Sequence, residues 1–286
     1  FFKQKTAYEI VDCDWSSDVC SSDLQSAATC IIINNKEVNI PAGKALLYNE
    51  DPFEAYIKIV QHFKPLQISD KAIDASAIIG KETVIMPGVF IGANVVIGKN
   101  CLIYPNVTIL ADTIIGDDVI IQANSVIGSD AFYYNAKKNR PHWYKKLLSC
   151  GRVIIENKVE IGACCTIDRG VSGDTIVGMG TKIDNMVHIG HDTQIEANCL
   201  FAAQVGIAGG VKIKSGVTIW GQAGVNKTLT IGENAVVLSQ AAVLASIEGN
   251  KTYMGFPAED ASIKRRELVW IRRIPELWKK IMDKEK

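Results

Sequence analysis

Between residues 73 and 127, every sixth residue of the chain is isoleucine, without a gap. Small or β-branched residues usually stand two places before these positions, and glycine often follows them, as at Gly80, Gly92 and Gly98. A short fixed period of this kind is typical of a solenoid, in which each coil covers the core of the previous one. The pattern predicts one short strand and one corner per hexad, three hexads per triangular coil, and a column of isoleucine inside.

The pattern resumes after an interruption at residues 129–152. Ile155, Ile161 and Ile167 restart it, a four-residue slip follows at 171–175, and the register then holds from Val177 to Val243. We therefore predict a mainly β fold, with a parallel β-helix domain over residues 69–258 from which loop 129–152 projects.

Composition narrows the class of protein. The chain has 31 basic and 31 acidic residues, a balance that does not favour nucleic acid as a partner. No apolar run approaches the roughly 20 residues that cross a bilayer, so no membrane span is expected. Cys101, Cys165 and Cys199 occupy the small-residue position of the repeat, which predicts buried free thiols and fits a reducing, cytoplasmic location. Cys164 and Cys165 are adjacent and lack the C-x-x-C spacing of a zinc site, so no metal is expected there.

The first 68 residues differ from the rest. Residues 1–24 have no period and read as translated sequencing adapter, which excludes them from fold reasoning and implies that the true N-terminus is missing. Without them the chain has 29 basic and 26 acidic residues, a net charge of +3. Residues 25–68 predict two strands and a helix capped by Asp51, which we interpret as the remnant of a truncated α/β domain.

Loop 129–152 is too long for a corner and is rich in aromatic and basic residues. Long loops on a rigid scaffold often carry function. Aromatic and basic residues together are also found in nucleic-acid sites, but this is one loop in a nearly neutral chain. A lid over an anionic ligand is the favoured interpretation.

Two histidines flank an inward position of the repeat. His188 and His191 lie on either side of Ile189, so both are expected to leave the prism, His191 at the corner. An exposed imidazole ordinarily titrates near pH 6.5 and can take a proton near neutral pH. A structural role or a metal site is the alternative for this pair, although further ligands are missing from neighbouring hexads. No serine or cysteine has a nucleophile's spacing, which favours direct attack assisted by a base.

The motifs GRVIIENKVEIGACCTIDRG, DNMVHIGHD, AAQVGIAGGVKI and GFPAED resemble those of the UDP-3-O-acylglucosamine N-acyltransferases of lipid A synthesis, over about residues 28–286. The resemblance implies a left-handed β-helix, an exception to the right-handed crossover rule, and a homotrimer with sites between subunits. It also implies transfer of a 3-hydroxyacyl chain from acyl carrier protein to the 2-amino group of a UDP-linked 3-O-acylglucosamine. The acyl carrier protein thioester is then a co-substrate, and no cofactor is expected.

The same resemblance assigns site residues. The family's general base falls on His191, and its oxyanion donor falls on the backbone N–H of Gly209. Asp192, next to His191, would orient or acidify the imidazole. A second family histidine maps to Thr228, so its role is either absent or taken by Lys227, whose cation would serve a phosphate. Asn185 and His188 complete the predicted substrate-binding set.

Residues 259–286 predict a C-terminal helix with an apolar stripe and Pro275 as a kink or a second start. From Ser262 onward it has nine basic and four acidic residues. A solvated face explains this charge. Alternatively, three such helices cluster at the trimer axis and offer their arginines to acidic acyl carrier protein, namely Arg265, Arg266, Arg272 and Arg273.

Two other functions stay open. One is a related enzyme of the same fold, either the O-acyltransferase acting on UDP-N-acetylglucosamine or an acetyl-CoA-dependent sugar acyltransferase. The other is a non-catalytic hexapeptide scaffold, of which a carbonic-anhydrase-like form is disfavoured because its three-histidine zinc set is not visible.

Overall fold

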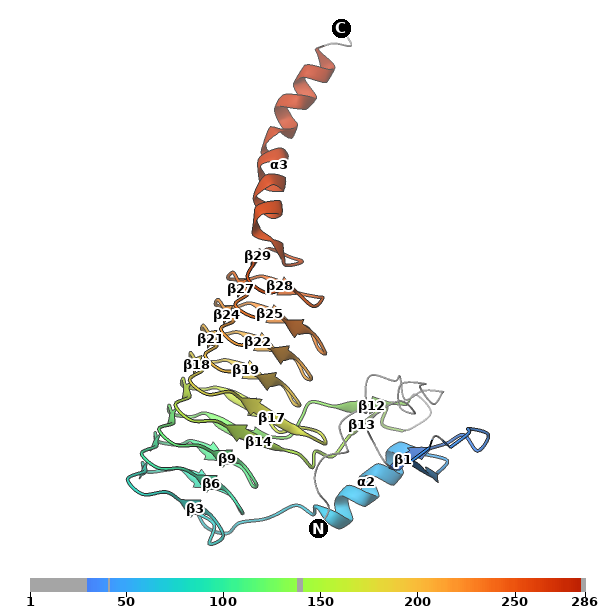
Figure 1. The fold of residues 1–286 in the computed structure, drawn as a ribbon, viewed down its shortest axis with the longest axis vertical. Helices are drawn as coiled ribbons and strands as arrows, with labels where there is room; N and C mark the ends of the chain where they lie inside the picture. Colours follow the sequence, from blue (N-terminus) through green and yellow to red (C-terminus); the bar gives the residue numbers. More distant parts are fainter. Residues whose placement is uncertain (1–29, 41, 138–140, 284–286) are drawn as a thin grey trace.

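The computed structural model describes residues 30–40, 42–137 and 141–283. Residues 1–24, interpreted as adapter, lie outside this description, as do residues 25–29 of the segment interpreted as an α/β remnant. Within the described residues, short strands stack into three long sheets that form the faces of a β-helix (Figure 1). The predicted prism of hexads is therefore confirmed.

Each face takes one strand from each coil. The first face comprises β4 (Val84–Ile85), β7 (Leu102–Ile103), β10 (Ile120–Ile121), β15 (Glu160–Ile161), β18 (Lys182–Ile183), β21 (Leu200–Phe201), β24 (Thr218–Ile219), β27 (Val236–Val237), β29 (Thr252–Met254) and the antiparallel β30 (Glu259–Asp260). The second face comprises β5 (Phe90–Ile91), β8 (Thr108–Ile109), β11 (Val126–Ser129), β16 (Thr166–Asp168), β19 (His188–Ile189), β22 (Gly206–Ile207), β25 (Gly224–Val225) and β28 (Ala242–Val243). The third face comprises β3 (Ile78–Ile79), β6 (Val96–Ile97), β9 (Ile114–Ile115), β14 (Arg152–Ile155), β17 (Asp174–Val177), β20 (Gln194–Ile195), β23 (Lys212–Ile213) and β26 (Thr230–Ile231).

Parallel pairing keeps the isoleucine column in register. Ile103 pairs with Ile121, Ile121 with Ile161, and Ile161 with Ile183, so both interruptions of the repeat are looped out and the stack continues. The inward side chains from Ile91 onward are almost completely buried, whereas Ile73 and Ile79 at the open end of the solenoid are 40% and 37% exposed. The column is thus continuous except in the first coil, which no further coil covers among the described residues.

The corners need a left-handed backbone, and asparagine and aspartate often supply it. Asn94, Asn100 and Asn124 have φ values of 57°, 56° and 61°. These residue types tolerate this conformation because their short polar side chains bond locally. Asn94 Nδ2 donates to Asp112 Oδ1 of the next coil at 3.3 Å, so the corner residues also link successive coils.

The predicted buried thiols are confirmed. Cys101, Cys165 and Cys199 are free and at most 1% exposed. Burial raises the pKa of all three thiols, that of Cys199 to about 11. They therefore act as small core residues rather than as reactive groups.

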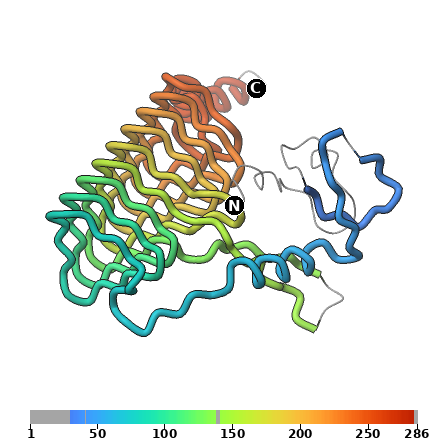
Figure 2. The backbone as a smooth tube through the Cα atoms, turned by 60° about the horizontal axis from the view of Figure 1, so that its bottom comes forward, coloured from blue at the N-terminus to red at the C-terminus, as the bar shows by residue number. Residues whose placement is uncertain are grey.

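The N-terminal unit packs against the long loop. It contains the parallel strands β1 (Cys30–Ile33) and β2 (Ala45–Tyr48) and the helix α2 (Pro52–Phe63), which Asp51 caps as predicted by accepting from Glu54 N at 3.3 Å. The loop forms an antiparallel hairpin, β12 (Tyr134–Ala136) and β13 (Tyr144–Lys146). Figure 2 shows α2 beside this hairpin. A second apolar cluster joins them through Phe53, Ile57, Ala131, Leu147 and Val171.

The chain ends in the helix α3 (Ala261–Met282), which projects from the end of the solenoid (Figure 1). Asp260 caps it by accepting from Ser262 N at 2.9 Å. Pro275 lies inside the helix, so the segment does not divide into two helices. No helix of the described part of the chain has both the length and the apolar character needed to cross a membrane.

The stack of inward side chains predicts a large loss of stability when one is truncated. Ile109 is fully buried, and Ile109→Ala is expected to lower the free energy of unfolding by about 2–5 kcal/mol because a cavity remains. Thr108→Ala, on the outward side of the same strand, serves as the control and should cost less than about 0.5 kcal/mol. Urea unfolding followed by circular dichroism measures both, and equal losses would contradict the inward assignment.

Candidate active site

The corner after β19 holds an imidazole and a carboxylate in contact. His191 Nδ1 lies 2.8 Å from Asp192 Oδ2. The same carboxylate accepts backbone hydrogen bonds from Val171 N at 3.0 Å and Gly173 N at 3.1 Å. An ionised carboxylate only accepts, so His191 Nδ1 carries the proton in the neutral ring and Nε2 has the free lone pair.

Gly209 occupies the equivalent corner one coil later and touches the His191 ring. A Cβ atom at Gly209 would lie 2.4 Å from His191 Nε2. Any residue other than glycine at this position would therefore displace the His191 ring. A Cβ at Gly190 would lie 2.7 Å from Gly209 N. Among the described residues no hydrogen bond is made by the N–H of Gly209. The structure therefore brings together a basic nitrogen and an unengaged amide, as two of the predicted residues require.

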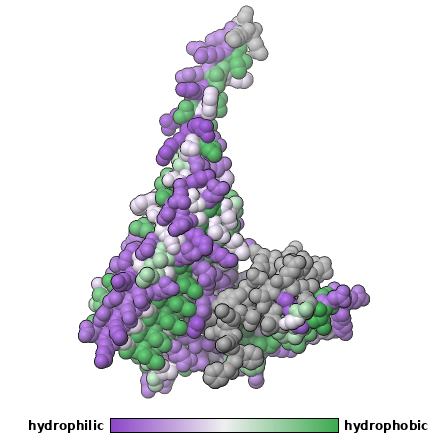
Figure 3. Space-filling view, in the orientation of Figure 1, coloured by the Kyte–Doolittle hydropathy of each residue, from purple (hydrophilic) through white to green (hydrophobic). Residues whose placement is uncertain are grey.

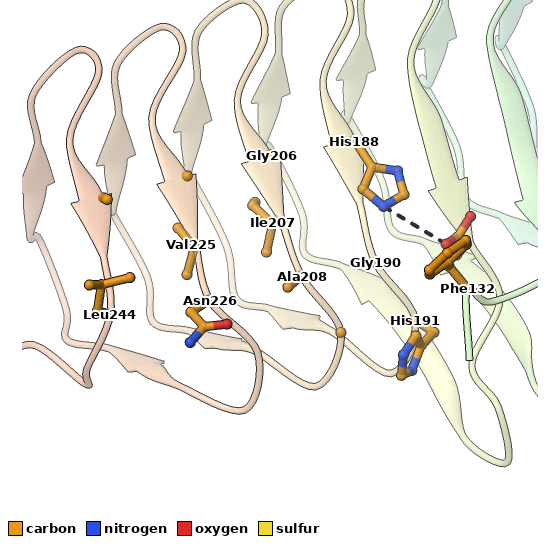
Figure 4. Close-up of a pocket in the computed structure, with 14 residues that line it drawn as sticks. Phe132, His188, Gly190, His191, Gly206, Ile207, Ala208, Val225, Asn226 and Leu244 are labelled. Atoms are coloured by element: carbon orange, nitrogen blue, oxygen red, sulfur yellow. Dashed lines mark ion pairs between the residues drawn. The ribbon is translucent and has the colours of Figure 1, made fainter. Parts of the chain in front are cut away.

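A second histidine and a buried carboxyl group lie on the same face. His188 Nδ1 lies 2.8 Å from Thr166 Oγ1, and His188 Nε2 lies 3.9 Å from Asp168 Oδ2 (Figure 4). The Asp168 side chain is 8% exposed and accepts from Ser129 Oγ at 2.6 Å. Burial raises the pKa of Asp168, against the opposing effects of Ser129 and of the His188 and His191 charges. The predicted residue His188 is thus part of a polar cluster.

These groups line one end of a groove of about 670 Å³. His188, Gly206, Gly224 and Ala242 are aligned in register on successive strands of the second face, so beyond His188 the outward positions are small. Figure 4 places both histidines toward one end of the groove and Leu244 at the other. A polar end followed by a shallow floor of small residues suits an elongated, largely apolar ligand with one polar end.

The structure separates Asn185 from this groove. Asn185 lies at another corner of the prism, where its Oδ1 accepts from Ala163 N at 2.7 Å. Lys227 is exposed at the same corner as His191, two coils later, and its N–H donates to Asn226 Oδ1 at 2.9 Å. Thr228 follows it with a φ of 60°. The substrate-binding roles of Asn185 and Lys227 stay predictions.

Sequence reasoning missed Asp168 and Phe132, which both line the groove. Asp168 had a usable signal, because it follows the inward Ile167 on the strand that pairs with β19. Phe132 belongs to the aromatic set of loop 129–152, but its place in the groove depends on how that loop folds. Its side chain is 84% exposed.

The cations of the loop are used within the chain. Lys137 pairs with Asp51 at 2.7 Å and Lys145 with Glu54 at 2.7 Å, so both tie the hairpin to α2. Lys146 pairs with Asp130 at 2.7 Å. Lys138 and Arg140 lie outside the described residues. These pairs give the predicted lid over an anion no support, and the contribution of the loop to the groove is aromatic.

The described residues contain no cluster of three or more histidine, cysteine or acidic side chains suited to a metal ion. The two histidines of the groove each contact a different carboxylate instead.

Comparison with known proteins gives three kinds of match. A model of the bacterial transferase hexapeptide (six repeats) family matches residues 76–111 and 94–129. The UDP-3-O-acylglucosamine N-acyltransferase of Campylobacter lari is 46% identical over 132 residues, which are 46% of this chain and 41% of that protein. The protein of the same name from Methylococcus capsulatus is 34% identical over 161 residues, 56% of this chain and 45% of that protein. The chain therefore spans less than half the length of these curated relatives.

Solved structures share the architecture. The UDP-N-acetylglucosamine acyltransferase of Bacteroides fragilis superposes with a TM-score of 0.60 at 26% identity, over 70% of this chain and 77% of that chain. The one from Campylobacter jejuni gives 0.58 at 22% identity, over 66% and 71%.

The fold is therefore the predicted left-handed parallel β-helix with a C-terminal helix. The class of protein that the fold defines is thus a β-helix with six-residue repeats, and the hexapeptide family model matches one part of it. The particular resemblance is also confirmed, since the chain is similar to proteins named UDP-3-O-acylglucosamine N-acyltransferase.

The buried carboxyl group of Asp168 predicts a pH-dependent stability. Because its pKa is raised on folding, the folded state binds this proton more tightly than the unfolded state. Its contribution is therefore present at low pH and is lost as the pH rises through the raised pKa. Asp168→Asn stays neutral, so its stability relative to the native chain should increase between about pH 4 and pH 7. Urea unfolding across this range measures the difference, and a difference that falls with pH would contradict the prediction.

Proposed function

We propose that the chain is an acyltransferase that moves a 3-hydroxyacyl group from acyl carrier protein to the 2-amino group of a UDP-3-O-acylglucosamine. One observation carries the proposal: the free Nε2 of His191 lies against Gly209 at the polar end of an apolar groove. The similarity to proteins named UDP-3-O-acylglucosamine N-acyltransferase supports the choice of acceptor. The free buried thiols fit a cytoplasmic enzyme.

The geometry fits direct acyl transfer. His191 Nε2 takes a proton from the amine as its nitrogen attacks the thioester carbonyl carbon, and the carbonyl electrons move to oxygen. The N–H of Gly209 donates to this oxyanion, a contribution typically worth about 10²–10³ in rate. Collapse breaks the carbon–sulfur bond and releases the carrier thiolate, which takes the proton from the His191 imidazolium. Asp192 holds the ring in the tautomer that this sequence requires.

The rest of the groove suits the two substrates. The floor of Gly206, Gly224 and Ala242 leaves room for an acyl chain, which would run from the reacting carbonyl toward Leu244. His188 and the carboxyl group of Asp168 offer donors and acceptors to sugar hydroxyls at the polar end. The Lys227 cation would bind a phosphate of the UDP group. Asn185, which lies outside the groove described above, would bind substrate at its own corner of the prism.

A homotrimer would cover apolar surface that a single chain leaves open. On the third face the outward positions of β3, β6, β9, β14 and β17 are all isoleucine or valine, and Ile78 is 62% exposed. Figure 3 shows apolar side chains gathered over these coils. Contiguous exposed patches of this kind mark interaction surfaces. A neighbouring subunit on this patch would also form the second wall of the groove.

Helix α3 supports the same assembly. Trp270, Ile274, Leu277 and Ile281 follow a heptad spacing and are 45–59% exposed. A heptad seam of this kind is normally buried between helices. Three copies at the trimer axis would bury it and would leave the arginine residues outside, where acyl carrier protein could dock.

A second function has one specific observation in its favour. The Bacteroides fragilis structure, at 26% identity, is a UDP-N-acetylglucosamine acyltransferase. Transfer to a sugar hydroxyl would use the same base and amide. An assay offering both acceptors with one acyl carrier protein thioester separates the two, because only the N-acyltransferase forms an amide with the 3-O-acylated sugar.

The general-base role predicts the outcome of one substitution. His191→Ala is expected to abolish measurable transfer, since loss of a general base typically costs about 10²–10⁴ in rate. His62→Ala, on α2 and outside the groove, is the matched control. Steady-state assays with acyl carrier protein thioester and amine acceptor measure both. Native turnover in His191→Ala would refute the assignment.

The basic side of α3 predicts a partner-specific effect. None of the four arginines, Arg265, Arg266, Arg272 and Arg273, is within ion-pair distance of a carboxylate in the described chain. Their replacement by glutamate should raise the KM for acyl carrier protein with little change in kcat, because like charges would then face each other. Lys81→Glu with Lys99→Glu, on exposed corners of the first coils, is the control. An unchanged KM would identify the arginines as a solvated face.

A further inference from the structure

Helix α2 is connected to the imidazole of His191 by a short series of hydrogen bonds. Tyr56, on α2, donates its hydroxyl proton to Val171 O at 3.2 Å. Val171 N donates to Asp192 Oδ2 at 3.0 Å, and the same oxygen lies 2.8 Å from His191 Nδ1. Three contacts therefore separate a side chain of the N-terminal unit from the catalytic ring.

The link passes through the slip that interrupts the repeat. Residues 169–173 connect β16 to β17 and replace an ordinary corner, and the slip at 171–175 runs from this connection into the start of β17. Both Val171 N and Gly173 N point at the Asp192 carboxylate, while Asp192 N donates to Thr175 Oγ1 at 2.9 Å. The slip thus surrounds Asp192 with hydrogen bonds. The slip in turn is held by a residue outside the β-helix, Tyr56 of α2.

Tyr56 helps to hold Val171, and with it the slip, in place. Val171 O accepts from Cys150 N at 2.8 Å as well as from Tyr56, and the Tyr56 hydroxyl lies 3.4 Å from Cys150 Sγ. Burial, with the nearby Cys150 and Asp192, raises the pKa of Tyr56 far above its ordinary value. The hydroxyl group therefore keeps its proton near neutral pH and acts as the donor to Val171 O.

We infer that Tyr56 is a positioning residue, which orients the His191 imidazole through Val171 and Asp192 and so makes the base depend on the docking of α2. The kinetic part of this inference rests on the proposed acyl transfer, whereas the orientation of the ring does not. The N-terminal unit, which lies outside the β-helix, would then control the reactivity of a residue on it.

Other groups also face His191. Tyr133, from loop 129–152, meets the ring edge-on with centroids 5.6 Å apart. Asp168 interacts with it through charge, and Asp192 through direct contact. Replacement of the Tyr56 hydroxyl changes none of these groups chemically, so a change at His191 would report the link through the slip.

The test compares two tyrosine-to-phenylalanine variants of the full chain. Tyr56→Phe removes the hydroxyl and keeps the ring in the apolar cluster. Tyr253→Phe is the matched control, since it loses a similar bond, from its hydroxyl to Glu248 O at 3.1 Å, at the far end of the solenoid. Histidine labelled with ¹⁵N reports the tautomer of each of the four rings, and His191→Ala assigns the signal. Asp192→Asn gives the spectrum of a ring that has lost its carboxylate.

Tyr56→Phe should shift the His191 signal toward that of Asp192→Asn and lower kcat about five- to tenfold, with KM changed less than twofold. Tyr253→Phe should leave both unchanged. A His191 signal in Tyr56→Phe that matches the native chain would overturn the inference, whatever the kinetics. Absence of transfer by the native chain would refute the proposed function, and the tautomer measurement would still decide the role of Tyr56.

Discussion

Parallel stacking of one coil on the next is the constraint on which the whole molecule depends. Each inward residue pairs with its equivalent in the next coil, as Ile189 does with Ile207, so equivalent corners must also stack. This is why His191 and Gly209, eighteen residues apart, are in contact. Backbone hydrogen bonds and a buried aliphatic column hold both corners in place.

The two departures from the repeat are where the site acquires its remaining parts. Loop 129–152 brings Phe132 to the groove and Tyr133 to the His191 ring, and the slip at 171–175 turns two backbone N–H groups toward Asp192. A regular corner would offer only the repeating pattern of bonds between coils. Breaks in a solenoid are thus informative positions, since the stack tolerates them only when the extra residues can be looped out.

The sequence alone was sufficient for the features that depend on local pattern. The isoleucine period predicted the prism, the small-residue position predicted the buried thiols, and Asp51 before proline predicted a helix cap. Contacts between segments far apart in the chain could not be predicted from the sequence. The pairing of Lys145 with Glu54 depends on how α2 and the loop fold back on the solenoid, and no period encodes that. Exposure of Ile73 and Ile79 was missed for a related reason, because a repeat does not state which coil is uncovered.

The groove and the imidazole impose different demands on the chain. The floor of the groove needs only small outward residues on rigid strands, and Gly206 and Gly224 meet this demand through the repeat itself. The imidazole needs one tautomer and one orientation, which the six-residue period does not specify, although the ring is largely covered, with its side chain 19% exposed. Its orientation must therefore come from the particular groups around this corner. Asp192 supplies it directly, and the slip that surrounds Asp192 is packed against α2 through Val171. The stacked coils thus set the distance between His191 and Gly209, while the contacts of Asp192 with His191 and with the slip bear on the direction of the imidazole.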